Sequence, residues 1–245
     1  MTSLVIPSRF CGPPGMGNGG YVCGRLAGYL DGPAEVMLRR PTPLDRPLSV
    51  VKAQDGVLLM DGESVLAEAR PNTPAADAVR TATHAQAVTA AAAPSIPDAH
   101  HPLPHCFVCG PGRASGDGMH IRPGRLGIGG AWVLAAPWTP ASDLTTSDGL
   151  VAPEFVWAAL DCPGGYAVVA DDATAVLLGK LTATILRRPE AGEPCAVTAW
   201  PSGRDGRKLF AGSAVFGADG ALIARGWATW ILVPPEALQA SACAT

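Results

Sequence analysis

An almost wholly apolar run, GLVAPEFVWAALDCPGG at 149–165, has the pattern of a buried helix. Pro153 and Glu154 stand near its start, where proline fits the first helical turn and a carboxylate offsets the partial positive charge of a helix N-terminus. Residues 155–160 are all apolar and leave no polar face, so we expect the helix to be buried on most sides. The Pro-Gly-Gly at 163–165 is expected to bend or end it.

A second helix candidate is GGYVCGRLAGYL at 19–30, and both candidates are followed by the same pattern of strands. An apolar strand leads into Leu-Arg-Arg-Pro, a short turn and a second proline at 36–50 and again at 184–197. An Asp-Gly turn with alternating apolar residues follows at 61–69 and at 219–228, the period of a half-buried strand. Two matched elements in the same order indicate an internal duplication.

The segment between the two copies is rich in alanine and poor in large apolar residues. Its first part is interpreted as a surface helix and its proline-rich end as a connector. The predicted organisation is an N-terminal half at 1–75, a linker at 76–104, a C-terminal half at 105–235 and a tail at 236–245. One apolar helix followed by antiparallel strands, twice, predicts an α+β fold in which a sheet covers each buried helix.

Composition narrows the classes of function. The chain has 245 residues, 48% of them hydrophobic, which is enough for one large domain or two small ones. The net charge is −3 and the 18 Lys and Arg form no basic stripe with aromatic residues, which argues against nucleic-acid binding. No apolar run reaches the ~18 residues of a membrane span, and the N-terminus lacks the pattern of a signal peptide. Seven scattered cysteines, an odd number, favour reduced thiols and a cytoplasmic protein.

Cys106 and Cys109 have the Cys-x-x-Cys spacing of a zinc knuckle. The nearby histidines are His100, His101, His105 and His120. A structural zinc needs four ligands, and such a knuckle usually comes with a second pair of ligands, which is not evident here. We therefore expect a packed turn before a strand and no bound metal. A redox role is also weakly supported, because no βαβ pattern surrounds the motif.

Five stretches resemble segments of hotdog-fold acyl-CoA thioesterases. They are a Gly-Gly helix start, a Cys-Phe-x-Cys-Gly lead-in to a strand, a helix ending in Leu-Asp and two later strands, at 17–30, 105–124, 149–165, 182–200 and 220–231. The first is similar to tandem members of the family, and the others to its phenylacetate-pathway type. The resemblance implies a tandem, or double-hotdog, α+β fold, each half an antiparallel sheet wrapped around one buried helix.

The resemblance also implies a site. In the family, a backbone N–H at a helix start polarises the thioester carbonyl, and a carboxylate two turns along a helix acts as general base or nucleophile. The two groups usually come from opposite protomers. On this chain, the donor position matching Asp161 is Pro153, which has no N–H, and the acid position matching Gly19 is Ala27. Gly19 and Asp161 would therefore form one composite catalytic site, and the pseudo-equivalent second site would be inactive.

Five neighbours of this pair are candidates for substrate binding. Two flank the glycine and three share a helical face with the acid: Asn18, Gly20, Glu154, Trp157 and Ala158. That face is either solvated or lines a cavity, and the tryptophan favours the cavity. The glutamate is interpreted as a partner for the helix N-terminus, not as a second catalytic acid. Two alternatives stay open: Asp161 as an ordinary helix-end residue, and the two glycines as a loop closing onto a helix.

The predicted function is hydrolysis of an acyl-CoA or acyl-carrier-protein thioester between the two halves, with no metal or redox cofactor. The expected partner is a small acyl thioester, without nucleic acid or membrane, and self-association is left open. The alternative is a non-catalytic acyl-CoA-binding or assembly protein of the same fold. A hotdog dehydratase would need a histidine near a helix, and neither helix candidate contains one.

Two pairs of arginines are candidates for binding the phosphates of coenzyme A, at 39–40 and 187–188. Adjacent residues on a strand face opposite sides of the sheet. At most one arginine of each pair is therefore expected to reach a ligand, and solvated strand ends are the simpler interpretation.

Overall fold

The computed structural model describes residues 2–74, 78–128, 131–169 and 175–238. Within these ranges, one antiparallel sheet of eleven strands packs against helices. The α-helices are α1 (Gly19–Ala27), α2 (His84–Ala91) and α3 (Pro153–Val168). The strands are β1 (Thr2–Leu4), β2 (Ala34–Leu38), β3 (Leu48–Ala53), β4 (Gly56–Asp61), β5 (Ser64–Pro71), β6 (Gly124–Ile128), β7 (Ala131–Trp138), β8 (Ala175–Ile185), β9 (Cys195–Asp205), β10 (Lys208–Phe216) and β11 (Leu222–Val233). No helix in the described ranges has the length and apolar character to cross a membrane.

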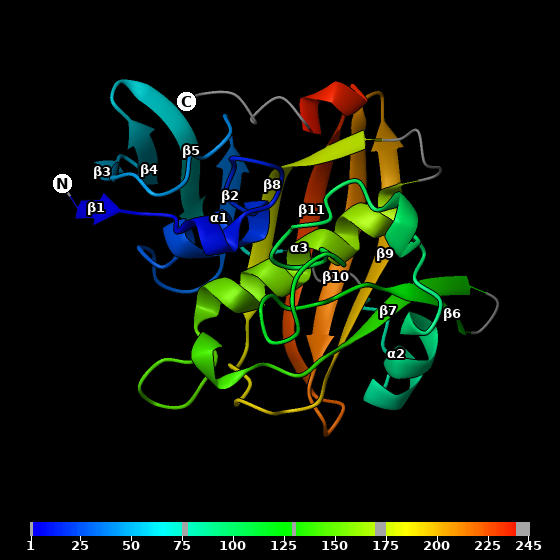
Figure 1. Ribbon diagram of the computed structural model, residues 1–245. Coiled ribbons are helices and arrows are strands. Elements are labelled where there is room, and N and C mark those ends of the chain that lie inside the picture. The colour runs from blue at the N-terminus through cyan, green and yellow to red at the C-terminus, as the bar shows by residue number, and fades with distance from the viewer. Residues whose placement is uncertain (1, 75–77, 129–130, 170–174, 239–245) are drawn as a thin grey trace.

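The strands follow one another in the order β1-β3-β4-β5-β2-β8-β11-β10-β9-β7-β6 (Figure 1). The first five strands of the chain form one end of the sheet, the remaining six form the other, and the two groups are joined where β2 pairs with β8. Each group has the same internal order. The first strand after the helix lies at the junction, the last strand of the group lies beside it, and the earlier strands follow outward. The two strand groups are thus joined edge to edge.

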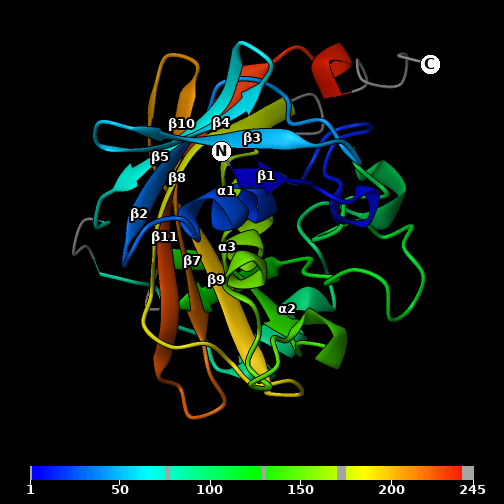
Figure 2. The same cartoon turned by 90° about the vertical axis from the view of Figure 1, so that its left-hand side faces the viewer.

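The sheet curves around α1 and α3, which pack against each other (Figure 2). Two glycines of α1 make this contact close. A Cβ added to Gly20 would lie 2.7 Å from the carbonyl oxygen of Trp157, and one added to Gly24 would lie 2.5 Å from the Cα of Glu154. Because the earlier glycine meets the later part of α3, the two helices run antiparallel. Their backbones approach so closely only because α1 carries no side chain at these positions.

The run at 155–160 is fully buried, as its apolar pattern predicts. Of the two outcomes expected for Pro-Gly-Gly, an end of the helix is excluded, because α3 continues through Pro163 to Val168, and a bend stays a prediction. Trp230 of β11 explains the continuation: a Cβ on Gly165 would lie 3.0 Å from its indole ring. Packing of this ring against the helix overrides the weak local preference to stop.

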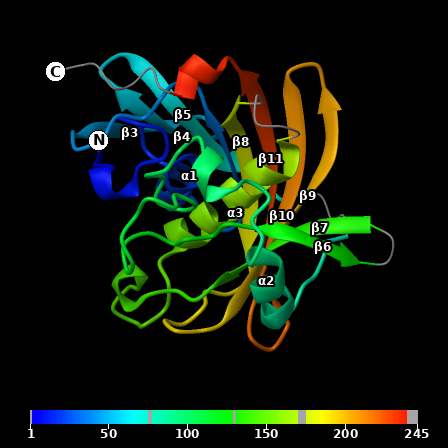
Figure 3. The ribbon, with the colours of Figure 1, turned by 45° about the vertical axis from the view of Figure 1, so that its right-hand side comes forward.

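The predicted linker contains α2, which confirms a helix in its first part. Thr83 and Gln86 form a capping box, in which each side chain accepts the backbone N–H of the other residue. Ala87 and Ala90 are buried, and the helix lies against β6 and β7 (Figure 3). The strands β1–β5 precede this segment and β6–β11 follow it. The boundaries of the two halves stay predictions, and residues 239–245 of the tail lie outside the described ranges.

Candidate active site

Asp161 lies on α3, 2% exposed, at the contact with the start of α1. Its Oδ2 accepts a hydrogen bond of 2.7 Å from the Gly20 N–H and one of 3.1 Å from the Asn18 side-chain amide. The Asn18 Oδ1 in turn accepts from the Tyr21 N–H at 2.9 Å, so that Asn18 caps α1 while it holds the acid. The residues around Gly19 and the acid eight residues into α3 are thus joined directly, across the two halves of the chain.

Burial raises the pKa of Asp161 to about 7, against the opposing effect of the hydrogen bonds from Gly20 and Asn18. The protonated and ionised forms are therefore close in free energy near neutral pH. Its second oxygen, Oδ1, is buried and has no hydrogen-bond partner among the described residues. A buried carboxylate oxygen without a partner is costly, and such an atom commonly marks a place where water or a ligand binds.

A cavity of about 280 Å³ lies beside this acid. Asn18, Gly19 and Asp161 line it together with mainly apolar side chains, among them Leu38 and Leu178. The Gly19 N–H is the first amide of α1 and has no acceptor within the part of the chain that the structure describes. The cavity thus combines an unused backbone donor at a helix N-terminus with a buried carboxylate.

A larger cavity of about 530 Å³ lies near the C-terminal end of α3, lined in part by Arg125, Trp132 and Tyr166. Its described lining contains no carboxylate and no amide of a helix N-terminus. The 280 Å³ cavity is therefore the better candidate for a catalytic site, although it is the smaller of the two.

Of the α3 residues expected to share one helical face, Asp161 lines the 280 Å³ cavity and the other three do not. Trp157 and Ala158 are buried against Gly20 of α1, and Glu154 lies 3.8 Å from the Arg25 guanidinium. None of these three α3 residues is among those that line the 280 Å³ cavity, and Gly20 is not either. The apolar character of this face reflects helix–helix packing. The pattern could not distinguish such packing from a cavity wall, because both exclude water.

The opposite end of the helix pair, where a second site would lie, has neither the donor N–H nor the carboxylate. The antiparallel contact places the C-terminal end of α1, with Ala27, toward the N-terminal end of α3, where Pro153 is the first residue. Ala27 has no carboxylate and Pro153 has no N–H. Gly19 and Asp161 thus lie at one end of the helix pair and Ala27 and Pro153 at the other, and the assignment of a single composite site stays a prediction.

Arg39 and Arg40 both line the cavity. The expectation that at most one arginine of a pair could do so assumed a strand, but β2 ends at Leu38 and the alternation of faces ends with it. Arg39 forms an ion pair with Glu68 at 3.1 Å, whereas the Arg40 side chain has no ion pair in the described ranges. Arg40 is thus a cation at the cavity that is free to meet an anionic ligand.

The matching arginines of the C-terminal half are both occupied. Arg187 pairs with Glu193 at 2.6 Å, and Arg188 pairs with Asp148. Neither lines the 280 Å³ cavity. Arg187 stabilises its own loop, and Arg188 joins that loop to the one that carries Asp148, so both arginines serve in structural ion pairs.

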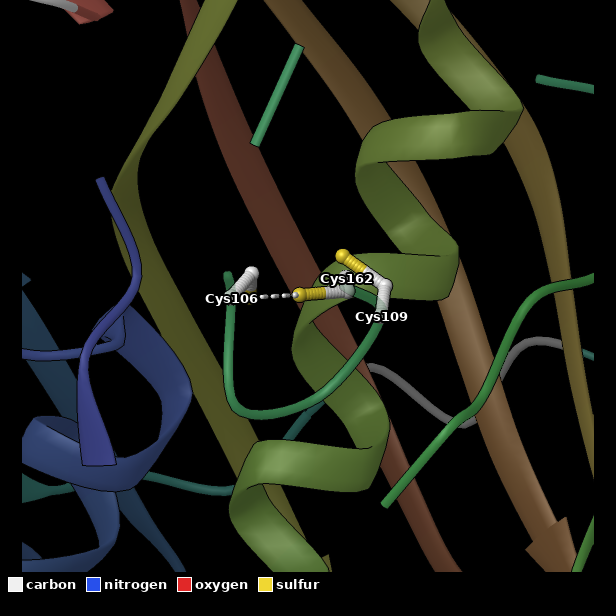
Figure 4. A group of neighbouring side chains, drawn as sticks. All are labelled: Cys106, Cys109 and Cys162. Carbon is white, nitrogen blue, oxygen red and sulfur yellow. Dashed lines mark hydrogen bonds between the residues drawn. The ribbon is translucent and has the colours of Figure 1, made fainter. Parts of the chain in front are cut away.

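Sequence reasoning missed a thiol. Cys162 follows the acid on α3 and brings its Sγ to 3.7 Å from that of Cys106, with Cys109 close by (Figure 4). Cys106 and Cys162 also line the cavity. Nothing in the spacing of the cysteines indicates this cluster, because 56 residues separate these two in sequence. All six described cysteines are free thiols.

Comparison with solved structures finds the same fold over nearly the whole chain. A TesB protein of Mycobacterium avium subspecies paratuberculosis has a TM-score of 0.58 at 16% identity, covering 91% of this chain and 90% of that one. The acyl-CoA thioesterase II TesB2 of Mycobacterium marinum has a TM-score of 0.59 at 14% identity, covering 89% and 90%. The chain has the fold of hotdog thioesterases. No protein-family model matches the sequence, and no curated protein does either.

Proposed function

We propose that the protein is a double-hotdog thioesterase that hydrolyses an acyl-CoA or acyl-carrier-protein thioester at one composite site. One observation carries the proposal: an unused N–H at Gly19 and a buried acid at Asp161, from different halves of the chain, line the same cavity. The similarity of the fold to acyl-CoA thioesterases agrees with this proposal, but it does not identify the catalytic residues.

The two groups suit the two needs of thioester hydrolysis. The Gly19 N–H, supported by the dipole of α1, would donate a hydrogen bond to the carbonyl oxygen as that oxygen becomes negative. Asp161, ionised and held through Oδ2, would take a proton from water at its free Oδ1. The hydroxide so formed attacks the carbonyl carbon. The tetrahedral intermediate then expels the thiolate, which receives the proton from Asp161.

Recognition of the substrate would be divided along the cavity. Apolar side chains such as Leu38, Leu178 and Ile231 would receive the acyl chain. Arg40, which has no ion pair among the described residues, would meet a phosphate of coenzyme A or of a carrier protein's phosphopantetheine arm. The proposed hydrolysis uses no metal or redox cofactor.

The alternatives make different demands on the cavity. A dehydratase would need a histidine there, but the described lining has none, and His101 is buried elsewhere with its Nε2 2.8 Å from the Tyr166 hydroxyl. A binding or assembly protein would hold the acyl-CoA without releasing a thiol.

A panel of acyl-CoA substrates of increasing chain length, with detection of the free thiol, tests the proposal. We expect enzyme-dependent release of coenzyme A with at least one substrate. Calorimetric binding of an acyl-CoA without thiol release across the panel would instead support the binding protein. Hydrolysis in ¹⁸O-labelled water under single-turnover conditions separates the two roles of the acid. General-base catalysis places the label only in the released acid. Label in Asp161 would therefore identify a nucleophilic role, through a mixed anhydride that water opens at the Asp161 carbonyl carbon.

A further inference from the structure

Three thiols from two separate segments converge beside the cavity. Cys106 and Cys109 project from the loop before β6, and Cys162 projects from α3 (Figure 4). Their sulfur atoms all lie within 4.8 Å of one another, and each residue is at most 8% exposed. We propose that these three cysteines form a binding site for one Zn²⁺ ion, an inference that does not rest on the hydrolysis proposed above.

The spacing of the sulfurs fits this ion. Zinc binds thiolate sulfur at about 2.3 Å in tetrahedral geometry, which places two sulfurs about 3.8 Å apart. The Cys106 and Cys162 sulfurs are 3.7 Å apart. The wider separations in the group, which stay within 4.8 Å, need to shorten by about 1 Å or less. A disulfide would require about 2.05 Å, so the three thiols are close enough to share an ion without being bonded to one another.

The loop that carries two of these thiols is built to hold them on one side. The Gly110 N–H donates to the Cys106 carbonyl oxygen at 2.9 Å, which closes the turn. A Cβ on Gly110 would lie 2.6 Å from the Cys106 backbone nitrogen, so only glycine fits there.

Neighbouring elements supply further support. The Phe107 N–H donates to the Cys11 carbonyl oxygen, and the Ile121 N–H donates to the Val108 carbonyl oxygen, both at 2.8 Å. The Asn18 amide nitrogen lies 3.9 Å from the Cys106 sulfur and 3.7 Å from that of Cys162. The cluster is therefore fixed from both sides before any ion binds, which lowers the cost of assembling the ligands.

The fourth position of the ion is left open. No fourth Cys, His, Asp or Glu of the described residues contributes a ligand atom to the group. Two of the three thiol-bearing residues, Cys106 and Cys162, also line the 280 Å³ cavity. Water or a small thiolate entering by the cavity would complete the tetrahedron, as in zinc sites with three protein ligands.

This proposal reverses the expectation of no bound metal. That expectation rested on the missing partners of Cys106 and Cys109, and on histidines close in sequence. The third thiol comes instead from Cys162, which the fold brings to the loop. An isolated buried cysteine is a small apolar residue, as Cys23 and Cys195 are here, but three convergent thiols form the donor set that soft metal ions prefer.

Titration of the reduced, chelator-treated full chain with Zn²⁺, against a chromophoric chelator, tests the site without any substrate. We expect one zinc per chain, with a rise in Tm. Cys162→Ser is expected to weaken zinc binding at least about 100-fold and to abolish the Tm shift. Cys195→Ala removes a buried thiol outside the cluster, and this variant should keep both the zinc binding and the rise in Tm. Co²⁺ is a second probe and should give a thiolate charge-transfer band in the wild type and in Cys195→Ala, but not in Cys162→Ser.

Uptake of less than stoichiometric zinc by the wild type, together with no Co²⁺ charge-transfer band, would overturn the proposal. Unchanged zinc binding in a folded Cys162→Ser variant would do so as well. If Cys162→Ser fails to fold, Cys109→Ser and the wild-type Co²⁺ spectrum decide. Because each of these is a binding measurement, a failure of thioester hydrolysis leaves the result unaffected.

Discussion

At the scale of single residues, the proposed chemistry depends on one oxygen of Asp161. Oδ2 is held by the Gly20 N–H and by Asn18, which leaves Oδ1 for water. Asp161→Asn keeps the shape and the oxygen that these donors need, but it removes the base. We expect kcat to fall by roughly 10²–10⁴ with little change in Tm. Thiol-release kinetics measure the first quantity, and thermal unfolding measures the second.

Glu154→Gln is the matched control for this variant, since Glu154 lies on the same helix but pairs with Arg25 outside the cavity. Its kcat should stay within about twofold of the wild type, because a partly exposed ion pair at this distance contributes little. Full activity of Asp161→Asn on a substrate that the wild type hydrolyses would contradict the proposed role of the acid.

A second residue-scale prediction concerns Arg40. Its free guanidinium at the cavity predicts that Arg40→Ala raises KM for acyl-CoA roughly 3–10-fold with little effect on kcat, the loss of one partly exposed charge-assisted hydrogen bond. An acyl-pantetheine, which lacks the phosphates, should be insensitive to the change. Arg188→Ala, which removes an arginine already paired with Asp148, is the control. Equal loss on both thioesters would show that Arg40 does not act through phosphate.

The resemblance to hotdog thioesterases, carried onto the two helix candidates, paired Gly19 with Asp161, and both residues line one cavity. Their catalytic roles stay predictions. The sequence pattern could not predict what Trp157 contacts, because a helix face that packs against another helix and one that contacts a ligand are equally apolar. It could not find Cys162 as a partner of Cys106 either, because only the folded chain brings α3 to that loop.

At the scale of elements, the contact of α1 with α3 positions the site. Gly24 lets the two backbones meet, and a Cβ there would lie 2.5 Å from the Cα of Glu154. We expect Gly24→Ala to destabilise the protein by roughly 1–3 kcal/mol through overpacking, although alanine is the better helix former by about 1 kcal/mol. Denaturant unfolding measures the difference.

Gly28→Ala is the control on the same helix. Gly28 has φ −61°, and the nearest atom to an added Cβ would be 3.5 Å away. This substitution should be neutral or slightly stabilising, because alanine fits the backbone and reduces the freedom of the unfolded chain. Equal stability of the two variants would mean that the helix contact is looser than the structure indicates.

The pattern of apolar residues predicted the positions of α1 and α3 well, but it predicted their C-terminal ends poorly. The apolar run at 155–160 is a buried helix because every face of it meets protein. The end of α3 depends on Trp230, which lies on a strand 65 residues beyond Gly165 and covers it. A local pattern contains no information about such a contact, and for that reason Pro163 is a misleading stop signal here.

At the scale of the whole molecule, Glu35 joins the two halves of the sheet. It lies on β2 and binds Lys180 of β8 at 2.9 Å and Arg70 of β5 at 2.5 Å, and it accepts a hydrogen bond from Thr182. Its side chain is 5% exposed, so its charge depends on these partners. Since β2–β8 is the pairing that unites the two strand groups, this carboxylate stabilises the frame on which α1 and α3 meet.

Burial alone would raise the pKa of Glu35, but the hydrogen bonds and charges of Lys180 and Arg70 outweigh it and hold the pKa below 4.5. A lowered pKa in the folded state means that the unfolded chain binds the proton more readily. The stabilisation is therefore complete above the unfolded pKa of about 4.5 and is lost as the pH falls through the lower folded value.

Glu35→Gln should cost roughly 1–3 kcal/mol at neutral pH, since both cationic partners are partly exposed. Its unfolding free energy should also fall less steeply than that of the wild type below pH 4.5. Glu68→Gln, which breaks only the exposed pair with Arg39, should cost under about 1 kcal/mol at neutral pH. Urea unfolding from pH 7 to pH 3 measures both quantities, and parallel curves for Glu35→Gln and the wild type would show that Glu35 does not govern the acid stability of the joined sheet.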